Sequence, residues 1–249
     1  MNQKQIIRQL SKSKNKYISL IGVIENYGIE SSFQAGDSLL ITVKTDHLWC
    51  YPAVECEKDL KELLGKFQYQ TLYFASLEEW MLPIIDQQRK IEWELKTERL
   101  ILPEKIVVSN NNSLSGNKKF MEKDFKIREL KAEDTDFIFS HSHYQQFTSK
   151  AYIKERIAAD CSIGIFLADE LAGWGLTHDD GALGFIHVRK SFRKKGLAHL
   201  IMEQLIRDKR SNKRNIFLNV EPNNSKAKKL FYSLGFKFDR MISWIKLKD

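Results

Sequence analysis

A basic loop that contains one glycine joins a predicted strand to a predicted helix near the end of the chain. The stretch VRKSFRKKGLAHLIMEQL, residues 188–205, carries five arginine and lysine side chains before the helix begins. Like charges so close together destabilise a fold unless an anion lies among them. Glycine lets the backbone approach a ligand, and the first turn of a helix offers unpaired N–H groups and a positive dipole end. The stretch therefore predicts an anion-binding turn.

The composition of this turn favours a nucleotide as its ligand. The turn lacks the Gly-Lys-Ser/Thr end of a Walker A loop and the three glycines of the dinucleotide fingerprint. Several basic side chains around a helix start suit a pyrophosphate with a separate phosphate better than one carboxylate. We therefore expect a nucleotide of another kind, and a solvated basic turn without a ligand is the alternative.

The overall composition is that of a folded protein with an anionic partner. The chain has 249 residues, enough for two modest domains, and its 43% hydrophobic and 29% charged residues are ordinary globular usage. The formal charge of +8 favours nucleic acid, an anionic membrane surface or a phosphorylated small molecule. The N-terminus lacks the apolar core of a signal peptide, no apolar run could span a bilayer, and Cys50, Cys56 and Cys161 lack metal-ligand spacing. We expect a cytoplasmic protein with free thiols and no metal.

A polar stretch divides the chain into two parts. Residues 109–119, SNNNSLSGNKK, have low complexity and no hydrophobic periodicity, which is typical of a linker. We therefore expect an N-terminal α+β domain over 1–108, a linker over 109–119 and a second domain over 120–249.

Hydrophobic patterns predict mixed helices and strands on both sides of this linker. Upstream, the predicted helices are 2–14, 57–67 and 76–95, the last ended or kinked by Pro83, and the predicted strands are 17–26, 37–45 and 71–75. Downstream, the predicted order is β, α, α, β, β, β, α, β, α, β, over 125–131, 132–147, 152–161, 162–170, 171–181, 182–188, 197–210, 215–220, 225–235 and 236 to beyond 244. The fold class that follows is α+β with a mixed sheet.

Residues 193–198, RKKGLA, resemble the acetyl-CoA-binding loop of the GNAT N-acetyltransferase superfamily. That loop reads Arg/Gln-x-x-Gly-x-Gly/Ala and follows the fourth strand, which usually ends in a valine where this chain has Val188. A second stretch, LNVEPNNSKAKKLFYSLGFK, is similar to the C-terminal segment of the superfamily. The matching residues are Asn224, Ala227, Phe231, Gly235 and Phe236.

The resemblance covers residues 118–249 and implies a fold and a cosubstrate. In such a fold the fourth and fifth strands splay apart and acetyl-CoA lies between them. The residues that the resemblance implies for CoA binding are Ile186, His187 and Val188 along the strand, Arg193, Lys194, Lys195, Gly196, Leu197 and Ala198 around the pyrophosphate, and Asn224 and Phe231 near the CoA arm.

The first half of the chain resembles the glycine N-acyltransferase-like branch of the superfamily. The stretches YISLIGVIENYG and DSLLITVKTDHLWCYPA are similar to the opening strands of that branch. Because no basic glycine loop occurs before residue 110, we expect a smaller, degenerate GNAT-like domain that binds no CoA. It would pack beside the catalytic domain and shape the acceptor site.

The resemblance leaves the catalytic groups open. Many members use a tyrosine as the acid for the leaving thiolate, but Phe231 stands at that position, and Tyr232 lies about 100° further around the helix. Asn219 replaces the glutamate common in protein N-terminal acetyltransferases, which disfavours that class. His187 suits the deprotonation of an ammonium group, with a packed strand histidine as the alternative. Glu221 is a further candidate base, with a solvated carboxylate as the alternative. For Tyr232 a structural role is favoured, and the role of the acid is the alternative.

Other polar residues have simpler explanations. His178, Asp179 and Asp180 are typical of a hairpin turn. His141 and His143 are two residues apart, which places them on different sides of a helix and argues against a metal pair.

The sequence thus predicts an acyl-CoA-dependent N-acetyltransferase. It would transfer an acetyl group from acetyl-CoA to the primary amine of a small molecule, such as an amino acid, by direct attack in a ternary complex. A catalytically degenerate CoA-binding sensor or assembly protein is the alternative, and a protein N-acetyltransferase is less favoured. We expect no nucleic acid or membrane partner, because the basic residues cluster at one loop without interleaved aromatic residues, and a homodimer is left open.

Overall fold

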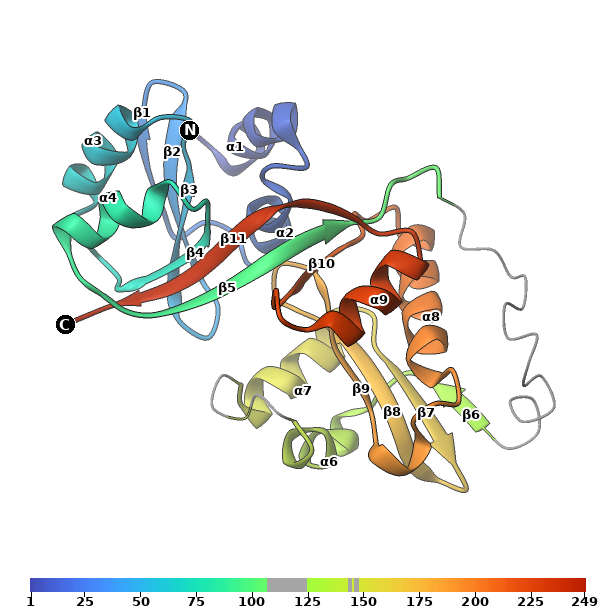
Figure 1. The fold of residues 1–249 in the computed structure, drawn as a ribbon. Coiled ribbons are helices and arrows are strands. Elements are labelled where there is room, and N and C mark those ends of the chain that lie inside the picture. The colour runs from blue at the N-terminus through green and yellow to red at the C-terminus, as the bar shows by residue number, and fades with distance from the viewer. Residues whose placement is uncertain (107–124, 143–144, 146–147) are drawn as a thin grey trace. The chain divides into compact units, whose positions relative to one another are not determined.

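The computed structural model describes residues 1–106, 125–142, 145 and 148–249 (Figure 1). The chain forms two compact units. The first unit comprises Met1–Arg99, Val220–Asn223 and Asp239–Asp249, and the second comprises Leu100–Asn219 and Asn224–Phe238. The predicted linker over 109–119 lies outside the described residues, and the domain division at that linker stays a prediction. Each unit takes residues from both sides of that linker.

The first unit contains a mixed sheet with helices on its two faces. Its strand order is β1-β2-β3-β4-β11-β5; β3 and β4 are parallel, and β1/β2, β2/β3 and β4/β11 are antiparallel. The parallel pair requires a crossover, which α3 supplies. Its elements are α1 (Gln3–Leu10), η1 (Ser11–Ser13), α2 (Ile18–Tyr27), β1 (Ser31–Ala35), β2 (Ser38–Lys44), β3 (Leu48–Ala53), α3 (Glu57–Phe67), β4 (Tyr73–Leu77), α4 (Met81–Gln88) and most of β5 (Ile91–Ile101) and β11 (Lys237–Leu247).

Strand β2 is buried along nearly its entire length because both of its faces are covered. Leu39, Ile41 and Val43 belong to a core that contains residues of α1 and α2, whereas Leu40 belongs to a core that contains residues of α3 and α4. Figure 1 shows these helix pairs on opposite sides of the strands. Successive side chains of a strand point to opposite faces, so a strand between two helix layers is buried at successive positions.

Two predicted elements of the first unit are wrong. Residues 17–26, predicted as a strand, form helix α2, in which six residues are buried. A short apolar run that is buried on most sides has no periodicity to distinguish a strand from a helix. Residues 76–95, predicted as one helix, form α4 and then strand β5. Pro83 does not kink this helix, because it occupies the first turn, where its missing N–H has no intrahelical acceptor. Strands β1 and β3 were not predicted.

The second unit contains the run of elements predicted downstream, except the last strand, most of which belongs to the first unit. Its strand order is β10-β9-β8-β7-β6, with β9 and β10 parallel and the other pairs antiparallel. Its elements are β6 (Phe125–Arg128), η2 (Ala132–Asp134), α6 (Thr135–Ser140), α7 (Lys150–Ala159), β7 (Ile163–Leu167), β8 (Glu170–Thr177), β9 (Leu183–Val188), η4 (Lys190–Phe192), α8 (Leu197–Ser211), β10 (Phe217–Val220) and α9 (Ser225–Ser233). The α+β class with mixed sheets is confirmed.

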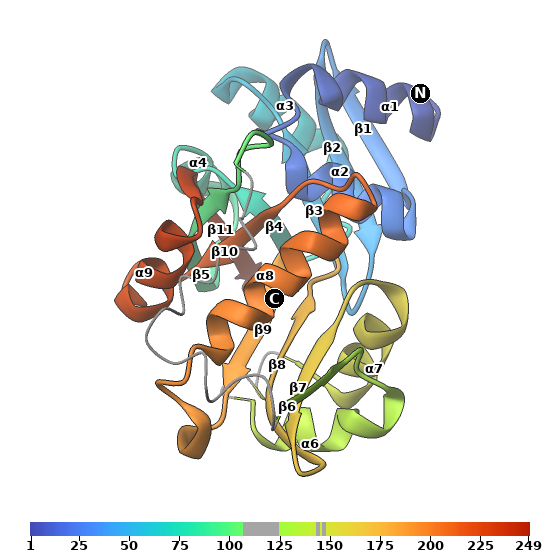
Figure 2. The ribbon, with the colours of Figure 1, turned by 90° about the vertical axis from the view of Figure 1, so that its right-hand side faces the viewer.

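Small residues on β8 let α8 lie close to the strands. Figure 2 looks onto α8, which crosses β8 and β9. A Cβ atom on Gly175 would lie 2.6 Å from Ile201 Cγ2 of α8. Trp174 points the other way, into the apolar core that contains Ile138 of α6 and Ile153 of α7. Glycine is therefore required here by close packing.

The same order of elements occurs twice along the chain. The run α1, α2, β1, β2, β3, α3, β4, α4, β5 corresponds to α6, α7, β7, β8, β9, α8, β10, α9, β11. In both runs the three successive strands pair antiparallel, and the third pairs in parallel with the strand that follows the next helix. The last strand of the second run, β11, belongs mostly to the first unit, where it pairs with β4.

Candidate functional site

The basic glycine loop begins helix α8 of the second unit without a capping side chain. Gly196 is the N-cap and has a φ of +81°, in the left-handed region that glycine adopts without strain. Among the described residues, no side chain accepts a hydrogen bond at this N-cap, and the first turn contains no acidic residue. Serine, threonine or aspartate at an N-cap would satisfy one of these N–H groups. The helix start is therefore suited to an external anion.

The basic side chains of the loop differ in their partners and in their exposure to solvent. Arg189 lies 2.5 Å from Glu170 and also donates to the carbonyl of Leu171, so its charge is used within the unit. Arg193 donates from Nε to the carbonyl of Val188 at 2.9 Å and is exposed, as is Lys194.

Two further groups complete the shape of the loop. Lys194 has a φ of 63°, so the backbone is left-handed two residues before Gly196 as well. The Lys195 ammonium lies 5.7 Å from the centre of the Phe192 ring, and Phe192 is buried. A cation over an aromatic face is held without losing its charge. The loop therefore places positive charge at the start of α8, where the Lys195 ammonium lies against the buried Phe192 ring.

A β-bulge in β9 interrupts its pairing with β8. Trp174 of β8 pairs with His187, and Leu176 pairs with Gly184, so β9 has one residue more than β8 over this interval. Phe185, within the interval, has a φ of 53°. Bulges bend a strand and increase its twist. In the described second unit, β9 and β10 pair only at Leu183 and Leu218, and the strands part after that pair.

His187, the candidate base, lies flat against a buried tryptophan. The ring centres of His187 and Trp174 are 4.4 Å apart and their planes are inclined by 16°. Trp174 is 2% exposed, while His187 is half-buried. The His141 ring lies 6.3 Å from the same indole at a steep angle. This packing fixes the plane of the His187 imidazole at the bulged part of β9.

The predicted residues of α9 lie in different environments. Asn224 is the N-cap of α9, and its side-chain oxygen accepts a hydrogen bond from the N–H of Ala227 at 3.2 Å. Phe231 is buried and packs 6.1 Å from Phe236, whereas Tyr232 is 44% exposed. The asparagine therefore has a local structural use, and the two aromatic residues point to different surroundings.

The remaining predicted residues are placed as follows. Glu221 belongs to the short segment Val220–Asn223 of the first unit, whereas His187 belongs to the second, so the structure does not bring the two candidate bases into one unit. The side chains of Ile186 and Val188 lie on the face of β9 that α8 covers. A Cβ atom added to Gly175 would contact Ile186, and one added to Gly173 would contact Val188. Leu197 is buried at the start of α8, and Ala198 is half-buried.

The His178 hairpin is explained by turn chemistry, as the sequence predicts. Asp180 accepts a hydrogen bond from the N–H of Ala182, and Asp179 accepts one from the N–H of Asp180. Burial lowers the pKa of His178, and the nearby Asp179 only partly opposes this. Among the residues that the structure describes, no cluster of His, Cys, Asp and Glu could hold a metal ion, and His143 lies outside them.

The sequence analysis treated Asn219 only as a missing base, but the structure gives it a distinct property. Its side-chain oxygen Oδ1 is buried and has no hydrogen-bond partner among the described residues. Asn219 follows Leu218 on β10, at the point where β9 and β10 part. No sequence pattern identifies an unpartnered oxygen, since that property depends on the surrounding packing.

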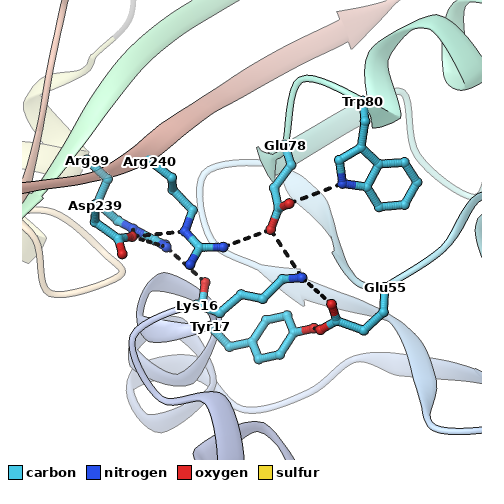
Figure 3. Close-up of polar contacts among 8 residues, drawn as sticks. All are labelled: Lys16, Tyr17, Glu55, Glu78, Trp80, Arg99, Asp239 and Arg240. Carbon is cyan, nitrogen blue, oxygen red and sulfur yellow. Dashed lines mark hydrogen bonds and ion pairs between the residues drawn. The ribbon is translucent and has the colours of Figure 1, made fainter.

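The first unit contains a polar network near the corresponding pair of strands, β3 and β4 (Figure 3). Lys16 lies 2.5 Å from Glu55 and 3.4 Å from Glu78, and Arg240 lies 2.9 Å from Glu78. The Tyr17 hydroxyl donates to Glu55 at 2.5 Å. Burial and this carboxylate raise the pKa of Tyr17. Burial alone would raise the pKa of Glu55, but the hydrogen bonds from Lys16 and Tyr17 lower it.

This network leaves little space. The adjoining cavity of about 10 Å³ has room for roughly one water molecule, and Lys16, Tyr17, Tyr51, Ser76 and Arg240 are among its lining residues. Figure 3 also shows Asp239, which accepts from both Arg99 and Arg240, and Trp80, which donates to Glu78. The charges of the network are thus directed at one another.

Comparisons with known proteins identify the fold. Residues 162–245 match the family model described as FR47-like protein. A comparison with curated proteins found no match. Among solved structures, an X-ray structure of a Drosophila protein is 15% identical, with 100% of this chain and 97% of that chain covered and a TM-score of 0.79. A GCN5-related N-acetyltransferase from Kribbella flavida is 8% identical, with 94% and 98% covered and a TM-score of 0.61. The chain has the GNAT fold.

A further solved structure of similar fold is described as a tandem GNAT protein. A tandem GNAT protein from the clavulanic acid biosynthesis pathway is 10% identical to this chain, with 92% of this chain and 87% of that chain covered and a TM-score of 0.53. Identities this low show the fold alone. The resemblance of the first half to the glycine N-acyltransferase-like branch stays a prediction. No helix in the described part of this chain is long and apolar enough to cross a membrane.

Proposed function

We propose that the protein is an acyl-CoA-dependent N-acetyltransferase that transfers the acetyl group of acetyl-CoA to the primary amine of a small molecule, such as an amino acid. The observation that carries this proposal is the start of α8, where Gly196 is a left-handed N-cap without a capping side chain and the neighbouring Arg193 and Lys194 are exposed. Such a helix start binds phosphate groups through its N–H groups and dipole.

The residues around this helix start fit a CoA molecule. Lys195, Leu197 and Ala198 would contribute backbone N–H groups toward the pyrophosphate, and Arg193 and Lys194 would add charge-assisted bonds. The edge of β9 from Ile186 to Val188 would bind the pantetheine arm where β10 has parted from it. Asn224 and Phe231 would line the region of the arm. When bound, acetyl-CoA supplies the activated acyl group as a thioester.

The first unit contrasts with the second at the corresponding turn. The turn between β3 and α3 contains Glu55, and Glu57 and Asp59 occupy the first turn of α3. These carboxylates interact favourably with the positive end of the helix dipole, and their negative charge repels phosphate. We therefore propose that only the second unit binds CoA.

His187 is the proposed base for the acceptor. It would take the proton that the amine loses, so that the nitrogen forms the new C–N bond as the C–S bond breaks and the products are an amide and the free thiol of CoA. A general base with a pKa near the working pH is effective in such a step. The stacking on Trp174 holds the imidazole plane in place. Tyr232 or water would return a proton to the thiolate, and Glu221 is the further candidate base.

A second candidate function is a CoA-binding protein without turnover. It is favoured by the burial of Phe231, which stands at the position expected for the acid, and by the exposure of Tyr232. In that case the protein would bind acetyl-CoA as a sensor or assembly component.

Thiol release from acetyl-CoA distinguishes the two functions. The purified protein is incubated with acetyl-CoA and glycine, glutamate, lysine, spermidine or a short peptide with a free N-terminus, and each product is identified by mass spectrometry. An acetylated small amine with a matching amount of free thiol is expected. Binding of acetyl-CoA without any acetylated product supports the second candidate, and acetylation of the peptide alone contradicts a small-molecule acceptor.

A further inference from the structure

One polar atom at the parting of β9 and β10 has no partner in the described structure. The Oδ1 atom of Asn219 is shielded from solvent and accepts no hydrogen bond from the described residues. Nearly all buried polar side-chain atoms in proteins are paired, because an unpaired one has lost its hydration without replacement. An exception at a candidate ligand site indicates a donor that arrives with the ligand.

The place of this atom in the fold restricts the donor. Asn219 is the next residue after Leu218, which forms the pair between β10 and β9, so its side chain points to the opposite face of the sheet from that of Leu218. On β9, the strand edge beyond the pair leads to the bulge at Phe185 and to His187. Asn219 and His187 thus flank the same parting of the strands, one from each side.

The chemistry of an amide oxygen also restricts the donor. A neutral asparagine accepts a hydrogen bond but cannot take up a proton at physiological pH. It can therefore hold an N–H group while another residue removes the proton. Phosphate and thioester oxygens are acceptors only, so they cannot satisfy this atom.

We propose that Asn219 binds the acceptor amine, with Oδ1 accepting a hydrogen bond from the N–H group of the nitrogen that attacks. This inference rests on the proposed function and assigns a residue to its acceptor site. Asn219 holds the amine at the parting of the strands, and His187 removes the proton. An amide N–H group of the pantetheine arm is the other donor that could bond to this oxygen. The experiment below distinguishes that donor from the amine.

Two variants of Asn219 test the inference, because they are expected to change the melting temperature and the KM for the amine in opposite combinations. Asn219→Leu keeps the size of the side chain and removes the oxygen, so without ligand it is expected to melt at the same temperature or higher, because an unpaired buried acceptor has been removed. Its KM for the best amine among glycine, glutamate, lysine and spermidine is expected to rise about tenfold to a hundredfold, the range for a hydrogen bond to a charged or polar donor. Its affinity for CoA, measured by calorimetry, stays unchanged.

Asn219→Asp serves as the matched control because it keeps an acceptor oxygen at the same place. It is expected to keep the KM for the amine within about threefold while melting at a lower temperature, since a shielded carboxylate pays for lost hydration. The leucine variant is thus stable with weak amine binding, and the aspartate variant is less stable with retained amine binding.

Three results overturn the inference. A lower melting temperature of the leucine variant without ligand would mean that Asn219 has a structural partner. A weaker affinity of that variant for CoA would assign the donor to the pantetheine arm. An unchanged KM for the amine would remove Asn219 from the acceptor site. By contrast, a wild-type protein that acetylates none of the four amines contradicts the proposed function itself.

Discussion

Substitution of Gly196 separates the charge requirement of the helix start from its backbone requirement. The φ of +81° at Gly196 is left-handed, so any side chain there costs about 1–2 kcal/mol of stability. Asparagine and aspartate tolerate this region best and have nearly the same shape. Both can also accept a hydrogen bond as an N-cap, which returns part of the lost stability. Gly196→Asn and Gly196→Asp should therefore have similar melting temperatures without ligand.

The two variants should differ strongly in CoA affinity. The aspartate places a negative charge at the helix start, and a carboxylate about 4 Å from a phosphate at an effective dielectric constant of about 20 costs about 4 kcal/mol. This corresponds to roughly a thousandfold weaker binding of the aspartate variant than of the asparagine variant. Isothermal titration calorimetry with CoA measures both. If the two affinities lie within tenfold of each other while both proteins are folded, no phosphate binds at Gly196.

Three further predictions concern the base, a buried ion pair and the last strand. His187→Ala should lower kcat/KM more at pH 7 than at pH 9.5, because a base is needed only while the amine is protonated, and equal losses would exclude His187 as the base. Burial alone would raise the pKa of Asp160, but the ion pair with Lys209 at 2.5 Å lowers it, so this pair stabilises the fold above about pH 4 and is lost as pH falls. Asp160→Asn should cost about 3–5 kcal/mol in urea denaturation at pH 7 and less at low pH, and a pH-independent cost would contradict this. Removal of residues 237–249 deletes the strand that pairs with β4 and removes Ile245 from the core that contains residues of α3 and α4. Cooperative melting of the first unit, followed by circular dichroism, should therefore be lost. Retention of cooperative melting would contradict the pairing of β11 with β4.

The second half of the fold was predictable because its signals are local. The glycine of the basic loop, the asparagine that begins α9 and the alternating stretch FKIRELK, which contains β6, each belong to a few adjacent residues. Such patterns fix the ends of elements without knowledge of their neighbours. The order of elements and the α+β class therefore followed from the sequence.

The first half was harder because its elements are set by burial. The run of α2 is apolar on nearly all sides, so a strand and a helix fit its composition equally well. The alternation in β5 follows α4 after two residues, and the predicted helix was extended across it. The position of β11 in the first unit depends on pairing with residues more than 150 positions earlier, which no local pattern encodes.

The candidate site was predicted only where motifs define it. Gly196 and the basic residues around it were identified by their spacing, and the structure places Gly196 at the uncapped start of α8. The bulge at Phe185 was missed because a left-handed phenylalanine in a strand has no sequence signature. The unpartnered oxygen of Asn219 was missed because it reflects tertiary packing. The strongest features of the proposed acceptor site thus come from the structure.

The central claim, that this GNAT fold binds acetyl-CoA at the start of α8, is tested most directly by thermal unfolding with acetyl-CoA, CoA or a duplex oligonucleotide. A ligand that binds only the folded protein stabilises it by about 2.7 kcal/mol at a hundred times its Kd, which corresponds to roughly 5–10 °C for a chain of this size. We predict such a rise with acetyl-CoA and with CoA, and none with the oligonucleotide. A rise with the oligonucleotide and none with either form of CoA would contradict the account.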